Sequence, residues 1–554
     1  MKRLSAYARW LWRSSEGMRT PLILNVLMGC ISILLNLLFI WLTKRLVDMA
    51  TGAIAVASGR EITLCAVYLV SAMLLRIVVN AVDTTLENNT FSKMNFLIRQ
   101  RLYSNLMMSQ WEGKERMHSG DTLNRLFSDV DQVTRIICQE LPSTLTTLFQ
   151  LLAAFIFLST MDIRLALALL LITPFFLLFS RLFFRRMRRL TRDIREDESK
   201  VQSHIQETLQ HKTVIQSLEM GEVARDHLEE LQDEEYSRVQ ERTRLNVLAR
   251  TMISLAFATG YVAALLWGVH GIYHGAITFG VLTAFLQLVG QIQGPSVRLA
   301  RQIPGFIYAT ASIDRLSELE KAPKEETGVP VALEGVCGVR FEGVSFRYHD
   351  GKRDILKDFS FDFPPGSKTS IEGETGVGKS TMIRLILSLL KPTEGKVLIY
   401  NDSESVEASS LSRVNLVYVP QGNSLFSGTI RDNLLLGDAS ADEGKMWQAL
   451  DLAAASFVRD LPQGLDTVCG EQGTGLSEGQ AQRIAIARGL LRPGSVMLLD
   501  EFSSSLDRDT EELLMKNLTA GYSDKTMIFI THREKISEYC DRVLKLQTIC
   551  GPLV

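Results

Sequence analysis

The chain has 554 residues, a formal net charge of -2 and 46% hydrophobic residues. This length leaves room for roughly two to four domains, and the near-neutral charge argues against a dedicated nucleic-acid binder, which would carry a basic surplus. The seven cysteines are scattered and never spaced as CxxC, which argues against a zinc site or a disulfide framework.

Residues 1–20 combine lysine and arginine with Tyr7, Trp10 and Trp12, and they contain no apolar core ahead of a cleavage site. This pattern differs from a secretory signal. It is typical of a helix that lies at the cytoplasmic interface with its aromatic rings at headgroup level. We therefore expect an interfacial N-terminal helix over 1–20, and a merely solvated N-terminus is the alternative.

Long apolar runs dominate the next region, residues 21–316. A helix needs about 20 mostly apolar residues to cross the hydrocarbon core, and runs of this kind lie at 21–43, 62–82, 141–160, 163–183, 247–271 and 278–297. So many runs in one half of a chain are difficult to bury in a soluble protein. The sequence therefore predicts an all-α six-helix transmembrane domain.

Two long intervals between these runs, 84–140 and 181–246, are rich in basic residues. Basic residues favour the cytoplasmic side, so we place both intervals and the N-terminus inside. Because the intervals are also poor in glycine and proline, we expect them to continue the membrane helices into the cytoplasm. Each interval then needs a reversal, near 110–120 and near 211–219.

Polar side chains interrupt two of the apolar runs, with Asp83 at the inner end of the second. Polar groups inside a membrane are costly and usually face a partner or a wet cavity. We expect a translocation path lined by Arg76, Asn80, Gln287 and Gln291. An equally favoured alternative is that these side chains hold neighbouring helices together, or that Asp83 extends to the membrane interface. One arginine per chain does not decide whether the path accepts an anion.

A linker is predicted at 317–338, where proline, glycine and charge occur without periodicity. The strand-like alternation of VRFEGVSFRY then opens a second domain, which we place at 339–554.

The segment 373–380 has the sequence GETGVGKS, which matches GxxxxGK[ST] and lies between a strand-like KTSIEG and a helix-like TMIRLILSLL. This is the context that a phosphate-binding loop requires. Glycine amides face the phosphates, Lys379 neutralises the β- and γ-phosphates, and the Ser380 hydroxyl binds Mg²⁺; the helix N-terminus also favours anions. The predicted ATP-binding residues are Gly373, Glu374, Thr375, Gly376, Val377, Gly378, Lys379, Ser380 and Thr381.

A second apolar run, SVMLLDE at 495–501, ends in two acids. A buried strand that delivers a carboxylate to a metal has this pattern. We predict that Asp500 holds Mg²⁺ and that Glu501 orients or deprotonates the attacking water. Together with the phosphate loop, this predicts an α/β P-loop ATPase domain.

These elements, in this order, resemble the ABC transporter family, specifically exporters that fuse a six-helix membrane domain to one nucleotide-binding domain. The resemblance covers essentially the whole chain. Tyr348 resembles the aromatic residue that stacks on adenine. Gln421 in VYVPQ resembles the glutamine that contacts Mg²⁺ and the water, and His532 in ITHRE resembles the switch histidine at the γ-phosphate. The resemblance thus implies a catalytic set of Glu501, His532 and Gln421.

Three further segments resemble family elements. LSEGQ at 476–480 resembles the signature that contacts the partner's ATP, which implies this role for Ser477, Glu478, Gly479 and Gln480. SSLD at 504–507 resembles the dimer-interface loop, with Asp507 as its acid. GEQG at 470–473 resembles the exporter segment that touches the intracellular helices. The third signature residue is usually glycine. We expect Glu478, which replaces it, to point away from the phosphate, while Ser477 and Gly479 approach it.

The resemblance implies a domain-swapped dimer in which two nucleotide domains enclose two ATP molecules. The partner is a second copy or a related half-transporter, and the reversals near 110–120 and 211–219 are coupling helices. Every catalytic position is filled, so the site is expected to hydrolyse ATP. The expected function is ATP-driven export of a hydrophobic or amphipathic small molecule, lipid or peptide across a bacterial cytoplasmic membrane. An importer on the exporter fold, as for iron chelates, and an ATP-gated channel or regulator are the alternatives.

Overall fold

The computed structural model describes residues 2–54, 59–110, 119–348, 351, 353–374, 376–470, 475–522 and 524–546. The chain forms two compact units. One comprises residues 1–104 and 119–320, and the other comprises residues 105–118 and 321–554.

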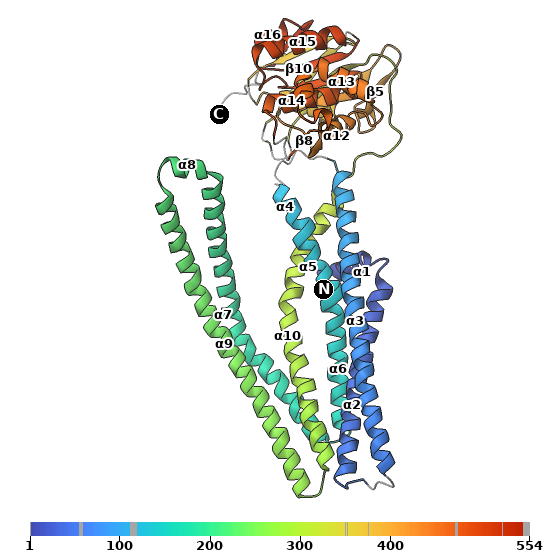
Figure 1. The fold of residues 1–554 in the computed structure, drawn as a ribbon, viewed down its shortest axis with the longest axis vertical. Coiled ribbons are helices and arrows are strands. Elements are labelled where there is room, and N and C mark those ends of the chain that lie inside the picture. The colour runs from blue at the N-terminus through green and yellow to red at the C-terminus, as the bar shows by residue number, and fades with distance from the viewer. Residues whose placement is uncertain are drawn as a thin grey trace. The chain divides into compact units, whose positions relative to one another are not determined.

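The described residues of the first unit are helical (Figure 1). A short helix, α1 (Lys2–Ser14), comes first. The long helices are α2 (Arg19–Ala50), α3 (Gly59–Met107), α7 (Ile163–Gln210), α9 (Gly221–Tyr273) and α10 (Phe279–Lys321). A further long helix consists of α4 (Ser119–Asn124), α5 (Val130–Arg135) and α6 (Leu141–Ser159), joined by π turns at Arg125–Asp129 and Ile136–Glu140.

The reversal expected near 211–219 contains the short helix α8 (Lys212–Ser217), which joins α7 to α9. Most of the reversal expected near 110–120 lies outside the described residues.

Within the described residues, four helical stretches are long and apolar enough to cross a membrane: Arg19–Ala50, Gly59–Met107, Gly120–Ser159 and Gly221–Tyr273. They contain the first, second, third and fifth expected spans, and the other two lie in α7 and α10. Large apolar side chains on these stretches are exposed, including Leu74 at 58% and Leu266 at 63%. Such a surface fits a lipid surrounding, because lipid tails are as apolar as these side chains.

A buried acid on α2 fixes the start of α10. Asp48 is 1% exposed, and its Oδ1 accepts a hydrogen bond of 3.0 Å from the backbone N–H of Gly280. A Cβ added at Gly280 would lie 2.4 Å from both that oxygen and the carbonyl oxygen of Lys44. Only glycine lets the two helices approach this closely, so Gly280 allows Asp48 to satisfy an otherwise unpaired N–H at the helix start.

A second buried acid ties the first π turn to α10. The carboxylate of Asp129 accepts hydrogen bonds from Nε of Arg315 at 2.7 Å and from Oγ of Ser312 at 2.8 Å. Asp129 is 2% exposed. A π turn inserts one residue into the helix, and here it ends at the residue that makes this contact.

The helices α7 and α9 pack along each other, and Figure 1 shows this pair diverging from α3, α6 and α10 toward α8. Ion pairs fasten the pair. The buried Asp197 of α7 lies 2.8 Å from Nη1 of Arg238 on α9, and Arg186 Nη2 lies 2.7 Å from Glu241 Oε1. The two helices therefore form a hairpin that is held together by ion pairs.

The second unit contains two main sheets. A four-stranded antiparallel sheet has the order β2-β1-β4-β5, and a five-stranded parallel sheet has the order β11-β3-β10-β9-β6. The antiparallel strands are β1 (Gly338–Phe346), β2 (Leu356–Phe363), β4 (Glu394–Tyr400) and β5 (Ser405–Glu407). The parallel strands are β3 (Lys368–Glu372), β6 (Leu416–Val419), β9 (Val496–Asp500), β10 (Thr526–Ile530) and β11 (Arg542–Lys545).

Helices cover the parallel sheet. They include α11 (Lys379–Ile386), α12 (Ile430–Leu435), α13 (Glu443–Leu452), α14 (Glu478–Leu491), α15 (Arg508–Gly521) and α16 (Glu534–Ser537). Every residue of β9 and β10 is buried, as in parallel strands that are covered on both faces. The helical region followed by an α/β domain confirms the predicted fold class. Ligands bind such sheets at the carboxyl ends of the strands, which directs attention to that edge.

Candidate active site

Four strands deliver predicted residues to the carboxyl edge of the parallel sheet. β3 runs into the loop that begins at Gly373, and β6 leads to Gln421. β9 ends at Asp500, which is paired in register with Ile530 at the end of β10, two residues before His532. Residues far apart in sequence meet here because parallel strands end at one edge.

The phosphate loop depends on its glycines. Gly376 and Gly378 have φ angles of 85° and 110°, a region that side-chain-bearing residues rarely adopt. A Cβ at Gly373 would lie 2.7 Å from the carbonyl oxygen of Leu546. The loop then enters α11 at Lys379, so that backbone N–H groups at a helix start face the site. Thr375 lies outside the described residues.

Four predicted side chains form one polar network. Nε2 of Gln421 donates to Oε2 of Glu501 at 2.6 Å. The other oxygen of Glu501, Oε1, lies 3.2 Å from Nε2 of His532. The same histidine nitrogen lies 3.0 Å from Nζ of Lys379, which also donates to the carbonyl oxygen of Gly373 at 2.6 Å. The predicted catalytic and phosphate-binding side chains are thus in close polar contact with one another.

His532 Nε2 has two competing neighbours. The ammonium of Lys379 can only donate, so this contact needs a lone pair on Nε2. The carboxylate of Glu501 can only accept, so that contact needs a hydrogen on Nε2. One nitrogen serves one of these neighbours at a time, and the tautomer or protonation state of His532 selects which.

Burial shifts the two charged groups nearest the phosphate position toward their neutral forms. It lowers the pKa of Lys379, opposed by the charges of Glu501 and Asp500. It also raises the pKa of Asp500 to about 6, and the charge of Glu501 adds to this increase. An anion beside Lys379 and a cation beside Asp500 would each reverse these shifts. Negative charge beside Lys379 and positive charge beside Asp500 would therefore restore the charged forms of both groups.

The remaining predicted ATP-binding residues surround α11. Ser380 is exposed in its first turn, while Val377 and Thr381 are buried and Glu374 is exposed. The hydroxyl of Tyr348 lies 3.2 Å from Oγ1 of Thr381. The predicted adenine-stacking ring therefore lies beside the helix that starts at the phosphate loop.

Sequence reasoning missed Gln482, which holds Glu501 in place. Gln482 is fully buried on α14, and its Nε2 donates to the backbone oxygen of Glu501 at 3.3 Å, while its Oε1 accepts from Oγ of Ser505. Glu501 has a φ of 42°, a costly backbone conformation for a residue other than glycine. Its N–H donates to the carbonyl oxygen of Ile530 at 2.9 Å. A glutamine among the alanines of AQRIAIA was the available signal.

Tyr418 was also missed. It lies on β6 and hydrogen-bonds the carboxylate of Asp500, and burial together with that carboxylate raises the pKa of Tyr418 to about 12. At physiological pH it is therefore a neutral donor that fixes one oxygen of Asp500.

The LSEGQ segment begins α14. Oγ of Ser477 accepts from the N–H of Gln480 at 3.2 Å, and Oε1 of Gln480 accepts from the N–H of Ser477 at 2.9 Å. This is a capping box. Glu478 is exposed in the first turn, where the helix dipole stabilises negative charge. A Cβ at Gly479 would lie 2.8 Å from the carbonyl oxygen of Ser505, so Gly479 fits closely against the 504–507 loop.

Asp507 caps α15. Its carboxylate accepts from the N–H and the hydroxyl of Thr510 at 2.8 and 2.9 Å. The acid predicted for the dimer interface thus also stabilises its own helix. Most of the GEQG segment lies outside the described residues.

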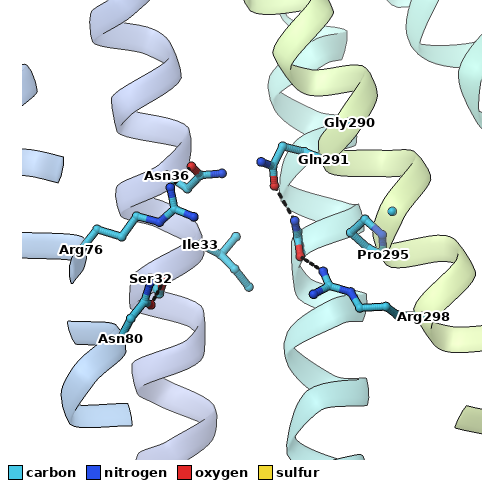
Figure 2. A pocket seen from close by; sticks show the side chains of 11 residues that line it. Ser32, Ile33, Asn36, Arg76, Asn80, Gly290, Gln291, Pro295 and Arg298 are labelled. Carbon is cyan, nitrogen blue, oxygen red and sulfur yellow. Dashed lines mark hydrogen bonds between the residues drawn. The ribbon is translucent and has the colours of Figure 1, made fainter. Parts of the chain in front are cut away.

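A separate cavity of about 610 Å³ lies within the helical unit (Figure 2). Arg76, Asn80 and Gln291, which we predicted on a translocation path, all line it. Gln287 is not among its lining residues in the described part of the chain. Arg298, which the sequence did not single out because it falls beyond the sixth apolar run, lines it as well.

Comparisons with known proteins match both units to known protein families. The family model for the ABC transporter transmembrane region matches residues 22–296, and the ABC transporter model matches residues 356–504. A Staphylococcus aureus protein whose proposed role is multidrug export as an ATP-binding/permease protein is 28% identical over 83% of this chain and 80% of its own length. A Bacillus subtilis protein with the same proposed role, YgaD, is 27% identical over 96% of this chain and 92% of its own length.

The solved structure of a bacterial Atm1-family ABC exporter with ATP bound matches with a TM-score of 0.79 and 22% identity, over 96% of this chain and 94% of that one. The two family models cover the membrane region and the nucleotide-binding region in the predicted order. The chain is therefore a multi-pass bacterial membrane protein that belongs to the ABC transporter family, with one transmembrane region fused to one ATP-hydrolysing domain.

Proposed function

We propose that this chain is one half of a dimer that uses ATP to export a hydrophobic or amphipathic molecule across the bacterial cytoplasmic membrane. The observation that supports it best is the continuous network from Lys379 through His532 and Glu501 to Gln421. The proposed roles of the Staphylococcus aureus and Bacillus subtilis relatives support the direction of transport.

In this proposal Glu501 orients and deprotonates the attacking water, and Gln421 fixes the carboxylate at 2.6 Å. His532 moves its Nε2 hydrogen bond between Glu501 and the γ-phosphate. Lys379 leaves the carbonyl oxygen of Gly373 to meet the phosphates. Positioning and charge stabilisation of this kind account for most of the catalysis in phosphoryl transfer.

We also infer a place for Mg²⁺ beside ATP. Ser380, Gln421 and Asp500 offer hydroxyl, amide and carboxylate oxygens, which this cation prefers. The carboxylate of Asp500 is 7% exposed, and burial raises its pKa to about 6. A buried acid of this kind fits a cation that compensates its charge. When bound, Mg²⁺ neutralises charge on the phosphates.

Each chain supplies one phosphate loop and one signature. Ser477 and Gly479 in the signature, together with Asp507, are proposed to complete the ATP site of the partner, with Glu478 and Gln480 around them. The side of the site at the half-buried Tyr348 would hold adenine. The helix α8, at the end of the α7–α9 hairpin, is the proposed coupling helix that transmits nucleotide-dependent movement to the membrane helices.

The proposal is tested with purified protein in liposomes, in which the ATP-binding domain of part of the population faces outward. We expect ATP-dependent accumulation of amphipathic dyes inside the vesicles, and no accumulation with the Glu501→Gln variant. ATP hydrolysis without any ATP-dependent flux, across a broad dye panel, would contradict export. Loss of uptake in cells that lack the gene would instead indicate an importer.

A further inference from the structure

The cavity in the helical unit has the size of a small-molecule site but an unusual lining. Its volume of about 610 Å³ is within the range of roughly 300–1,000 Å³ that ligand pockets occupy. Its polar side chains include Asn36, Arg76, Asn80, Gln150, Gln291 and Arg298, and the apolar Ile33 also lines it. They come from α2, α3, α6 and α10, helices that lie around the cavity in Figure 2. Polar groups among membrane helices are costly and mark functional sites.

The charge of the lining has one sign. Arg76 and Arg298 are its ionisable residues, and no carboxylate lines the cavity among the described residues. Arginine keeps its charge under all ordinary conditions. Figure 2 shows the two guanidinium groups reaching toward the cavity from opposite sides, Arg76 from α3 and Arg298 from α10.

Neither arginine is neutralised by its contacts in the described structure. Nη1 of Arg76 donates to the side-chain oxygen of Asn36, and Nη2 of Arg298 donates to Oε1 of Gln150 at 3.3 Å. Both partners are neutral amides. Nε of Arg76 is buried and has no hydrogen-bond partner among the described residues. An unpaired buried donor on a charged group is costly, so the contacts within the bundle leave the Arg76 guanidinium incompletely satisfied.

The nearest acids on α3 belong to another cavity. Asp83 and Glu87 line a separate pocket of about 310 Å³ with Glu140, and Asp83 accepts a hydrogen bond of 3.2 Å from Asn25. On α3, the positive and the negative side chains thus line two different cavities. The positive charge at Arg76 and Arg298 is therefore available to a ligand.

Contacts between side-chain amides, together with small residues, shape the cavity for a ligand. Gln150 donates to Gln291 while accepting from Arg298, and these two hydrogen bonds orient both amides. A Cβ added at Gly290 or Gly294 would meet nothing within 4 Å. The α10 wall is consequently open between the polar groups.

We propose that this cavity binds the oxyanion group of an anionic amphiphile, a carboxylate or phosphate, through Arg76 and Arg298. The inference rests on the proposed export function and names the chemical class of its cargo. Guanidinium groups bind carboxylate and phosphate in a bidentate geometry, and neither arginine has an acidic partner among the residues that line the cavity.

The test compares a fluorescent dansyl fatty acid with its uncharged methyl ester, binding to the full chain in nanodiscs without ATP. We expect the acid to bind more tightly than the ester. Arg76→Gln and Arg298→Gln should each weaken binding of the acid about tenfold, the size of one charge-assisted hydrogen bond, and leave the ester unchanged. Arg298→Lys should recover part of the loss. Arg164→Gln is the matched control, because it removes the same charge from the helical unit outside this cavity.

Equal binding of acid and ester, or equal weakening by Arg164→Gln, would overturn the proposal. Nanodiscs of phosphatidylcholine alone and of phosphatidylglycerol distinguish the source of the oxyanion. If phosphatidylglycerol competes with the acid, the oxyanion belongs to a lipid headgroup. If phosphatidylglycerol does not compete, the oxyanion belongs to a soluble amphiphile. Flux measured in liposomes distinguishes failure of the anion site from failure of the export proposal. ATP-driven export of neutral dyes without preference for the acid refutes only the anion site, whereas binding of the acid without any flux refutes only export.

Discussion

Nε2 of His532 lies 3.2 Å from Oε1 of Glu501, with the carboxylate 24% exposed on its side-chain surface. This pair connects the end of β10 to the end of β9 in a single contact, and it places a titratable ring next to the acid that is proposed to activate water.

Replacing Glu501 by glutamine should abolish hydrolysis without preventing ATP binding. The amide has the same shape but cannot take a proton, and general-base catalysis contributes about 10²–10⁴-fold to such rates. Phosphate release measures the loss, and binding of a fluorescent ATP analogue provides the control. Hydrolysis within about threefold of the wild type would show that another group is the base.

Two neighbouring signature positions should respond in opposite ways. Glu478→Gly should change ATP hydrolysis little, because Glu478 is exposed in the first turn of α14. Gly479→Asp should abolish it, because a Cβ there lies 2.8 Å from the carbonyl oxygen of Ser505 and the carboxylate repels phosphate. Gly479→Ala separates the steric effect from the charge. A large gain of activity in Glu478→Gly would mean that the carboxylate faces ATP.

Gln482→Leu should destabilise the nucleotide-binding domain and lower hydrolysis together. The substitution leaves the backbone oxygen of Glu501 and the hydroxyl of Ser505 without partners, at a cost of about 1–3 kcal/mol for each buried group left unsatisfied. Thermal unfolding and phosphate release report the two effects. The exposed Gln463 offers the control Gln463→Leu, which should affect neither. Unchanged hydrolysis in Gln482→Leu would show that Glu501 keeps its backbone conformation unaided.

The Asp129–Arg315 pair should behave as a coupled unit in a double-mutant cycle. Asp129→Ala and Arg315→Ala should each lower the unfolding temperature, and the double variant should lower it by less than their sum. The acid is buried while the arginine is partly exposed, at 3% and 44% of their side-chain surfaces, so we expect the larger single effect from Arg315→Ala, which strands a buried charge. Strict additivity would indicate that the pair contributes nothing measurable.

Cys540 should resist alkylation in the folded protein. Burial, with the charge of Asp541, raises its pKa to about 12, and the thiolate is the reactive form. At pH 8 the native thiol should react at least ~100-fold more slowly than after unfolding, as mapped by mass spectrometry with iodoacetamide. Because the Cys540 thiol has a higher pKa in the folded protein than in the unfolded one, its contribution to stability is full below the unfolded pKa. That contribution is lost as the pH rises toward 12. Equal labelling of folded and unfolded protein would contradict the burial.

The sequence was most informative where the functional residues lie close together in one short segment of the chain. Lys379 and Ser380 follow a glycine loop between a strand and a helix, and Asp500 ends an apolar strand, so each could be placed from its neighbours alone. Tyr418 and Gln482 could not, because their roles arise only when β6 and α14 pack against β9. Arg298 was missed for the same reason, because it lies past the sixth apolar run and shares a cavity with Arg76 only in the folded bundle. Membrane spans were visible because a long apolar run is itself the structural requirement.

The hydroxyl of Ser477 keeps a hydrogen that its capping box does not use. Its oxygen accepts from the N–H of Gln480, so the lone pair faces the helix and the O–H hydrogen remains able to donate outward. Aspartate caps helices equally well, but it offers no hydrogen and, in the proposed site, would present a negative charge to a phosphate. The position therefore selects a side chain that accepts on one side and donates on the other, a polarity that capping preference alone does not impose.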